Sequence, residues 1–328
     1  MAEDLSPQSI MKISRSFTES RILLTGVDLD IFNLLNAGPL SAAEITAGLN
    51  SDLRATTMIL DALAAAGYLE KKEGRYRTEP SVSPLLTDGS PDSILPGLRH
   101  AAHLWPAWSQ LTDVVLKGGP AEKREADRED HTTSFIGAMH VISSREAPKT
   151  IEAISPVRAR ALIDVGGASG SFTIAFLEKF PGMKVTIFDL PEVIQLARER
   201  VGEAGLLDRV NLVPGDYNKD ELPPGHDLAL LSAIIHQNSH ELNVMLYQKV
   251  FRSLDPGGRL IIRDYVMNSE RTEPASGAVF AVNMLVNTRG GNSYTLEEIR
   301  EGLTEAGFHR IRPLQNREMS SLVEAFRP

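Results

Sequence analysis

The sequence predicts an α/β chain in which a sheet rich in parallel strands is preceded by a mainly helical domain. Three observations predict this fold. An apolar strand at 162–165 runs into a glycine-rich turn and then into the helical run 172–180. Further apolar strands follow at intervals long enough for crossover helices. Residues 1–98 instead contain short helical segments separated by turns.

The first strand and its turn have the pattern of a nucleoside-binding loop in a Rossmann-like domain. Asp164 lies within the strand, and the glycines that follow are Gly166, Gly167 and Gly170. Glycine allows a sharp turn and a close approach to a ligand, and the free N–H groups of the next helix favour an anionic group. Val165 and Ala168 occupy positions where a dinucleotide fingerprint needs glycine. The spacing therefore disfavours NAD or FAD.

Four more strands are expected after this loop, at 185–188, 210–213, 227–231 and 258–262. Asp189 ends the second strand, where a carboxylate can accept both hydroxyls of a ribose. Asp216 follows the third strand and is placed to accept from an adenine amino group. Since parallel strands bring their carboxyl ends to one edge, we expect the ligand there.

This order of motifs resembles the class I S-adenosylmethionine-dependent methyltransferases. F-D-L-P at 188–191, G-D at 215–216 and His236 beyond the fourth strand narrow the resemblance to small-molecule O-methyltransferases of the caffeate and polyketide type. The resemblance implies S-adenosylmethionine as cofactor, S-adenosylhomocysteine as product and no metal. It implies a cofactor site formed by Asp164, Gly166, Gly167, Gly170, Asp189, Leu190, Asp216, Tyr217 and Ser232.

His236 matches the general base of that family and lies five residues after Leu231. A neutral imidazole can take the proton of a phenol or enol while the oxygen attacks the methyl group. Asp264, after the fifth strand, matches the acid that orients the histidine. The alternatives are a structural histidine that caps the next helix, and an ion pair between Asp264 and Arg263.

Two departures from the family pattern concern this base. His236 is followed by Gln237 where the family often has His-Asp-Trp, and Ser293 stands where a second acid is expected. A clamp of two acids on the histidine is therefore in doubt. His240 is four residues from His236, which predicts a second imidazole one helical turn away. Two histidines also allow a metal, but no third ligand with tight spacing is evident.

The N-terminal domain, 1–98, has the pattern of a winged helix. Helical apolar spacing covers 16–35, and Ser41 with Glu44 three residues later marks the start of another helix. A helix at 53–66 and a hairpin-like stretch at 67–78 follow. The helix at 53–66 offers only one basic residue, Arg54, which disfavours a reader of DNA. The family resemblance implies a homodimerisation domain instead.

Residues 99–155 are expected to form a helical connector that contributes to the substrate pocket, and 156–328 the catalytic domain. A dense charge run at 121–131 is expected to be solvated. By resemblance, the acceptor pocket includes residues from the connector and from an apolar helix at 277–286, with core packing as the alternative. The predicted acceptor residues are Phe135, Met139, His140, His240, Asn283 and Met284.

Composition limits the function further. The chain of 328 residues has a net charge of −9 and a pI near 5.5, which disfavours nucleic acid as partner. It has no cysteine, which excludes disulfides and thiolate chemistry. No signal peptide or membrane span is expected, so we predict a cytoplasmic protein.

The sequence thus predicts a homodimeric, cation-independent O-methyltransferase for the hydroxyl of an aromatic or polycyclic small molecule. One alternative is methylation at carbon, nitrogen or sulfur, including a tetrapyrrole carbon. Another is a cofactor-binding relative that no longer methylates or that acts as a regulator.

Overall fold

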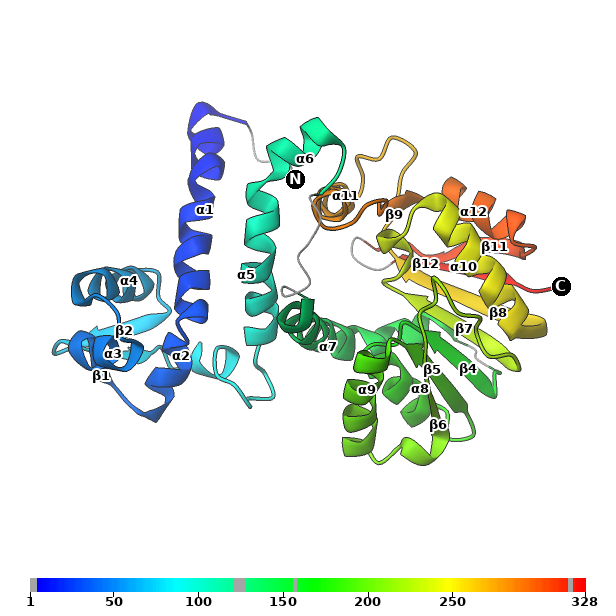
Figure 1. The fold of residues 1–328 in the computed structure, drawn as a ribbon, viewed down its shortest axis with the longest axis horizontal. Coiled ribbons are helices and arrows are strands. Elements are labelled where there is room, and N and C mark those ends of the chain that lie inside the picture. Colours follow the sequence, from blue (N-terminus) through cyan, green and yellow to red (C-terminus); the bar gives the residue numbers. More distant parts are fainter. Residues whose placement is uncertain (1–4, 121–127, 156–157, 318–320) are drawn as a thin grey trace. The chain divides into compact units, whose positions relative to one another are not determined.

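The computed structural model describes residues 5–120, 128–155, 158–317 and 321–328. The chain forms two compact units, one from 1–105 with 126–141 and the other from 106–125 with 142–328. Each unit has an apolar core of its own. Figure 1 shows the helices and strands of both units. Of the predicted charge run, residues 121–127 lie outside the described residues.

The first unit contains short helices and a three-stranded sheet. In chain order its elements are α1 (Pro7–Asp28), α2 (Ile31–Leu34), η1 (Leu35–Ala37), β1 (Leu40–Ser41), α3 (Ala42–Leu49), α4 (Leu53–Ala65), β2 (Leu69–Lys72), β3 (Arg75–Thr78), η2 (Ser83–Leu85), most of α5 (Leu95–Ser109) and the part of α7 (Arg128–Ile154) up to residue 141. The strand order is β1-β3-β2. The hydroxyl of Ser41 accepts the N–H of Glu44, whose carboxylate accepts the N–H of Ser41. The predicted helix start at Ser41 is therefore confirmed.

The helical structure predicted from the apolar spacing of 16–35 is confirmed, but two helices and not one continuous helix occupy this stretch. The first, α1, begins at Pro7 and ends at Asp28. Asp30 then adopts the left-handed conformation, with φ of 54°, and α2 starts at Ile31. Left-handed backbone cannot continue a right-handed helix. Apolar spacing alone did not reveal this break.

The second unit is a twisted sheet between helices. Its elements are α6 (Leu111–Lys117), part of α7 (Arg128–Ile154), β4 (Ala161–Val165), α8 (Ser171–Lys179), β5 (Lys184–Asp189), α9 (Pro191–Glu203), η4 (Leu207–Arg209), β6 (Val210–Pro214), β7 (His226–Ser232), η5 (Ile235–Gln237), α10 (His240–Ser253), β8 (Leu254–Asp264), β9 (Val266–Met267), α11 (Ala275–Asn287), β10 (Tyr294–Thr295), α12 (Leu296–Glu305), β11 (His309–Gln315) and β12 (Ser321–Phe326). The seven-stranded sheet has the order β11-β12-β8-β7-β4-β5-β6. Strands β4 to β8 pair in parallel, and β12 joins β8 antiparallel.

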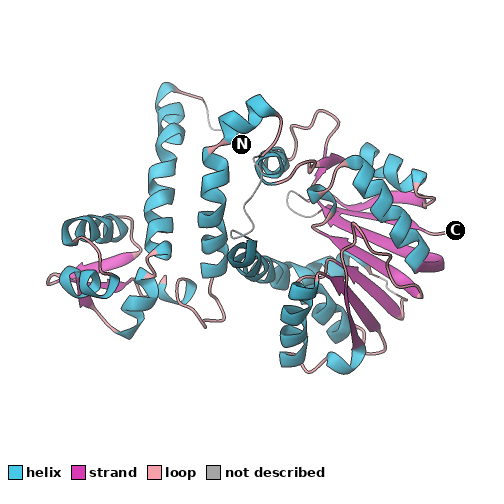
Figure 2. Ribbon diagram, viewed as in Figure 1, coloured by secondary structure: helices cyan, strands magenta, loops and turns pink. Residues whose placement is uncertain are grey.

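Side chains alternate between the two faces of this sheet. In β4, Leu162 belongs to the core under α7, α8 and α9, whereas Ile163 belongs to the core under α10 and α12. Figure 2 shows helices on both sides of the magenta strands. Strands buried on both faces read as continuous apolar runs, which is why the sequence revealed them.

The predicted α/β fold is confirmed, and the five predicted strands are β4 to β8. Strand β8 begins at Leu254, four residues before its predicted start. The sequence did not reveal this earlier start because a Gly-Gly pair interrupts the apolar run of the strand. The sequence did not predict β11 and β12. Strand β11 carries basic and polar residues at the sheet edge and shows little apolar pattern. No helix within the described ranges has the length and apolarity needed to cross a membrane.

Candidate active site

The glycine-rich loop connects β4 to α8 at the carboxyl end of the sheet. The N–H of Gly166 donates to the carbonyl of Phe188 in β5 at 2.8 Å. Gly170 caps α8 in the left-handed conformation, with φ of +75°. Gly166 also has a positive φ of +68°, a conformation that favours glycine. The predicted turn is therefore held tightly against the neighbouring strand.

Asp189, the last residue of β5, reaches across to this loop. Its Oδ2 accepts the N–H of Ala168 and its Oδ1 accepts the N–H of Leu190, each at 2.8 Å. Burial raises the pKa of Asp189. A carboxylate has about four acceptor positions, so these two donors leave capacity for two further hydroxyl donors. The remaining acceptor positions of Asp189 thus fit the two hydroxyls of a ribose.

Asp216 and Tyr217 follow β6 beside Asp189. The N–H of Gly215 donates to the carbonyl of Asp189 at 2.8 Å, which ties the two strand ends together. Burial, with the nearby charges of Asp189 and Asp216, raises the pKa of Tyr217 to about 12. Asp216 forms an ion pair with Lys219 at 2.9 Å. The structure brings these predicted cofactor residues together at one edge.

Asp164 lies beneath the loop and is only 2% exposed. The hydroxyl of Thr173 donates to its Oδ2 at 2.8 Å. A Cβ at Gly167 would come within 3.0 Å of the Asp164 carboxyl group, so the two residues are closely packed. Burial raises the pKa of Asp164 to about 7. This position suits a residue that shapes the loop.

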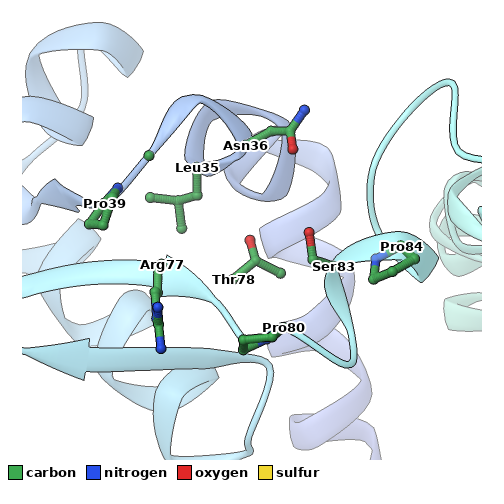
Figure 3. Close-up of a pocket in the computed structure, with 9 residues that line it drawn as sticks. Leu35, Asn36, Pro39, Arg77, Thr78, Pro80, Ser83 and Pro84 are labelled. Atoms are coloured by element: carbon green, nitrogen blue, oxygen red, sulfur yellow. The ribbon is translucent and has the colours of Figure 1, made fainter.

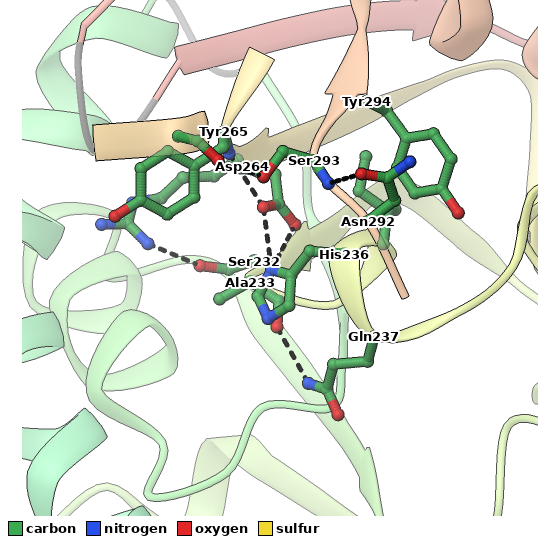
Figure 4. A network of polar contacts seen from close by, with 12 residues as sticks. Ser232, Ala233, His236, Gln237, Asp264, Tyr265, Asn292, Ser293 and Tyr294 are labelled. Atoms are coloured by element: carbon green, nitrogen blue, oxygen red, sulfur yellow. Dashed lines mark hydrogen bonds and ion pairs between the residues drawn. The ribbon is translucent and has the colours of Figure 1, made fainter. Parts of the chain in front are cut away.

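His236 and Asp264 form a buried pair across the ends of β7 and β8 (Figure 4). Since a carboxylate only accepts, the Nδ1–H of His236 donates to Asp264, 2.8 Å from Oδ1 and 3.0 Å from Oδ2. The N–H of Tyr265 also donates to Oδ1, at 2.8 Å. With the proton on Nδ1, the lone pair of His236 lies on Nε2, which has no hydrogen-bond partner in the described part of the chain.

Backbone contacts fix the segment that carries His236. Ala233 adopts a φ of +59°, and its N–H donates to the carbonyl of Arg263 at 2.8 Å. The side-chain amide of Gln237 donates to the carbonyl of Ala233, as Figure 4 shows. The N–H of Asn292 donates to the carbonyl of His236 at 2.9 Å. A non-glycine residue with positive φ persists only where its surroundings hold it.

Ser293 takes no part in the histidine pair. Its hydroxyl donates to the carbonyl of Gly277 at 2.8 Å, and the only carboxylate bonded to His236 among the described residues is that of Asp264. An aromatic contact that the sequence did not reveal is added instead. The ring of Phe280 meets the imidazole edge-on with centroids 4.8 Å apart, and it stacks on Tyr265.

The expectation that His240 lies one helical turn from His236 is wrong. His236 lies in η5, whereas α10 begins at His240 with Ser239 as its N-cap. Asn238 and Ser239 are extended, so no helix connects the two imidazoles. In the part of the chain that the structure describes, no three acidic or histidine side chains are grouped so that they could hold a metal ion.

Asn283 and Met284 lie on α11, as predicted. The Oδ1 of Asn283 accepts from the Trp108 Nε1–H and from the side-chain amide of Asn287, each at 3.0 Å. Met284 is buried. Trp108 is 175 residues away from Asn283 in sequence, so no local pattern pointed to this contact. It joins the connector segment to α11 within the second unit.

Three predicted acceptor residues lie on α7. Met139 and His140 are partly buried in the portion that belongs to the first unit. The side chain of Phe135 lies outside the described part of the structure.

The first unit also has a pocket of about 410 Å³ between η1, the end of β3 and η2 (Figure 3). Its walls are largely proline, leucine and hydroxyl side chains, with no carboxylate or imidazole, so it offers no acid–base pair.

Comparison with known families decides the identity. The profile of the O-methyltransferase domain matches residues 108–309. The chain belongs to the O-methyltransferase family. A second profile, the O-methyltransferase dimerisation domain, matches residues 11–88 of this O-methyltransferase. That match agrees with the scarcity of basic residues on α4.

Relatives cover nearly the whole of this O-methyltransferase. The chain is 28% identical over 316 residues to 3-hydroxy-5-methyl-1-naphthoate 3-O-methyltransferase of Streptomyces sahachiroi, covering 94% of this chain and 91% of the relative. It is 28% identical over 315 residues to the tetracenomycin polyketide synthesis 8-O-methyl transferase TcmO of Streptomyces glaucescens, covering 93% and 92%.

A solved structure gives the same fold. The structure of PigF with SAH superposes with a TM-score of 0.89 at 24% identity and covers 98% of this chain and 100% of that one. The PigF sequence from Serratia sp. (strain ATCC 39006) is described as an S-adenosyl-L-methionine-dependent methyl transferase. The predicted enzyme class and cofactor are thereby confirmed: this O-methyltransferase depends on S-adenosylmethionine.

Proposed function

We propose that this enzyme methylates the hydroxyl of an aromatic or polycyclic small molecule with His236 as general base. The observation that carries the proposal is the buried His236–Asp264 pair, which leaves Nε2 as the basic nitrogen. A carboxylate that fixes the tautomer of an imidazole is a recurring arrangement for proton abstraction. Family membership supports the reaction, and the geometry supports the residue.

S-adenosylmethionine, when bound, supplies an electrophilic methyl group on a sulfonium and leaves as the neutral sulfide S-adenosylhomocysteine. Nε2 of His236 takes the acceptor proton as the oxygen becomes nucleophilic. Asp264 stabilises the positive charge that develops on the imidazole. Burial of both residues keeps water from the proton, and Phe280 limits the rotation of the ring.

The cofactor site proposed here follows the carboxyl ends of β4 to β7. Asp189 receives the ribose hydroxyls, as its remaining acceptor capacity supports. Asp216, Tyr217 and the half-exposed Leu190 surround the adenine. The glycines 166, 167 and 170 bring the backbone close to the donor, Asp164 shapes their loop, and Ser232 ends the strand beside them.

The acceptor is proposed from the named substrates of the relatives. One is named for methyl transfer to a hydroxynaphthoate, and another is named an 8-O-methyl transferase of tetracenomycin polyketide synthesis. Both names describe methyl transfer to an oxygen, and the hydroxynaphthoate is a fused aromatic ring system with a hydroxyl. The pocket residues proposed for such an acceptor are Phe135, Met139, His140, His240, Asn283 and Met284.

We also propose a homodimer formed through the N-terminal domain, 1–98, with 99–155 as connector and 156–328 as catalytic domain. Large apolar side chains are exposed along the first half of α1, including Ile10, Ile13 and Phe17. A patch of this kind marks an interaction site. Sedimentation equilibrium should show a dimer that the double variant Ile13→Glu, Phe17→Glu converts to a monomer; a wild-type monomer would refute this assembly.

The test of the base is His236→Gln, with His309→Gln as a matched control on edge strand β11. We expect kcat for a hydroxynaphthoate or related phenol to fall about 100-fold or more, while the Kd for S-adenosylhomocysteine stays unchanged. Added imidazole should restore part of the rate. Transfer at the wild-type rate by His236→Gln, or an equal loss in the His309 variant, would exclude His236 as base.

A further inference from the structure

Arg263 is a buried cation that the proposed proton transfer leaves unused. It precedes Asp264 in β8 and is only 7% exposed. Among the described residues no carboxylate forms an ion pair with it. Its Nη1–H donates to the hydroxyl of Ser232 at a long 3.4 Å, and its Nε–H is buried without an acceptor. A buried guanidinium in this state is costly unless an anion approaches it.

The neighbouring acids are engaged elsewhere. Asp264 bonds to His236, and successive residues of a strand point to opposite faces of the sheet. Glu146 on α7 influences Arg263 electrostatically, but its carboxylate pairs with Lys149 at 3.2 Å. The other close contact is apolar, since the guanidinium lies 5.3 Å from the ring centroid of Phe172. Burial lowers the pKa of Arg263.

The position of Arg263 indicates which anion it serves. Ser232 and Arg263 are directly paired in the β7–β8 register, so their side chains share one face of the sheet. Strand β7 adjoins β4, which leads into the glycine-rich loop. Phe172 lies in the first turn of α8, immediately after that loop. The guanidinium is therefore enclosed by the elements that bound the proposed cofactor site.

We propose that Arg263 binds the α-carboxylate of the methionine part of S-adenosylmethionine, with Ser232 as its neighbour. S-adenosylmethionine, the methyl donor of the family, carries this carboxylate, and the guanidinium fork matches a carboxylate in two parallel hydrogen bonds. The buried Nε–H then gains an acceptor. The inference depends on the methyl donor of the family and not on His236.

Calorimetric titration of the full-length enzyme tests this assignment. The two probes are S-adenosylhomocysteine and its decarboxylated analogue, which lacks only the carboxylate. Wild-type enzyme should bind the first about 10- to 100-fold more tightly, as expected for a charged hydrogen-bonded contact. Arg263→Met should lose that preference, because it should weaken the binding of S-adenosylhomocysteine but not that of the decarboxylated analogue. Arg263→Lys should retain part of the preference.

Arg259→Met is the matched control, because Arg259 lies on the same strand and face but is ion-paired with Glu324. It should lower the Tm of the ligand-free enzyme without changing the preference between the probes. Arg263→Met should keep the ligand-free Tm or raise it, since it removes a buried charge without a counter-ion. A structural role for Arg263 predicts the opposite change in Tm.

Four results would overturn the assignment. Equal affinity of the wild-type enzyme for the two probes would exclude a carboxylate contact. Equal weakening of both probes by Arg263→Met would exclude it as well, and the same comparison with Arg263→Lys applies if only that variant can be purified. If Arg263→Met left the Kd of S-adenosylhomocysteine unchanged and raised KM only for acceptors that carry a carboxylate, Arg263 would belong to the acceptor site instead. If wild-type enzyme bound neither probe, the methyl-donor assignment would fail as well.

Discussion

The Oδ2 of Asp189 accepts the backbone N–H of Ala168 at 2.8 Å, so the acid that ends β5 also holds the loop that follows β4. One carboxylate thereby combines two tasks. It fixes the loop conformation before any ligand arrives, and its remaining acceptor positions are the ones proposed to receive the ribose hydroxyls.

Asp189→Asn should weaken cofactor binding through both tasks. An asparagine keeps one oxygen but turns an NH₂ group toward a backbone N–H or a ribose hydroxyl. We expect the Kd of S-adenosylhomocysteine to rise about 10- to 100-fold by calorimetry. The exposed Asp208→Asn serves as control and should bind as wild type. An unchanged Kd in the Asp189 variant would remove this residue from the cofactor site.

Gly166→Ala and Gly205→Ala separate backbone strain from crowding. Both glycines have nearly the same φ, +68° and +69°, so both variants should lose about 1 kcal/mol of stability to the left-handed conformation. Only at Gly166 would the new Cβ lie 2.3 Å from Ile234 Cδ1. We expect Gly166→Ala to cost about 1–3 kcal/mol more in urea unfolding and to weaken cofactor binding. Equal losses in the two variants would argue against a tightly packed loop.

Asp264→Asn should stop proton abstraction while preserving the shape of the site. The amide can offer its NH₂ to Nδ1, which places the imidazole proton on Nε2 and removes the basic lone pair. We expect kcat to fall about 100-fold or more with little change in the Kd of S-adenosylhomocysteine. Ser293→Ala should leave kcat near the wild-type value, because Ser293 bonds to the Gly277 carbonyl. Similar rates in both variants would contradict the role of Asp264.

Asp164 should make the ligand-free enzyme less stable as the pH rises. Burial raises its pKa from the ordinary 3.8 to about 7, so between these values the folded state binds a proton that the unfolded state has released. The free energy of unfolding should therefore decline from about pH 4 to pH 7 and level off above. Asp164→Asn does not titrate in this range. Its free energy of unfolding relative to wild type should therefore increase between pH 5 and pH 8, by on the order of a few kcal/mol in urea unfolding. A pH-independent difference would contradict a buried, proton-binding Asp164.

Much of the catalytic domain could be predicted because its central strands are buried on both faces. Strands β4 and β5 are mostly apolar, and each carries an acid at its next-to-last or last position, Asp164 and Asp189, which marks the sheet edge. The pairing of His236 with Asp264 also followed from their positions, since each comes at the end of one of two adjacent strands.

The rest depended on contacts that no local pattern encodes. Asn283 accepts a hydrogen bond from Trp108, which lies far away in the sequence, and the guanidinium of Arg263 lies over the ring of Phe172. The break between α1 and α2 depends on one residue, Asp30, with an unusual φ. Local periodicity reports which face is apolar, but not which distant side chain covers it.

Strand β8 ends in two consecutive residues of opposite charge, Arg263 and Asp264, which the pleat directs to opposite sides of the sheet. A shift of one residue in the alignment of β8 with β7 would exchange them, placing a cation beside the imidazole and an anion beside Ser232. The proposed binding of the S-adenosylmethionine carboxylate and the proposed removal of the acceptor proton would then both fail. The six antiparallel pairs between β12 and β8, from Ser321–Asp264 to Phe326–Arg259, thus hold both side chains in the register that the proposed chemistry needs.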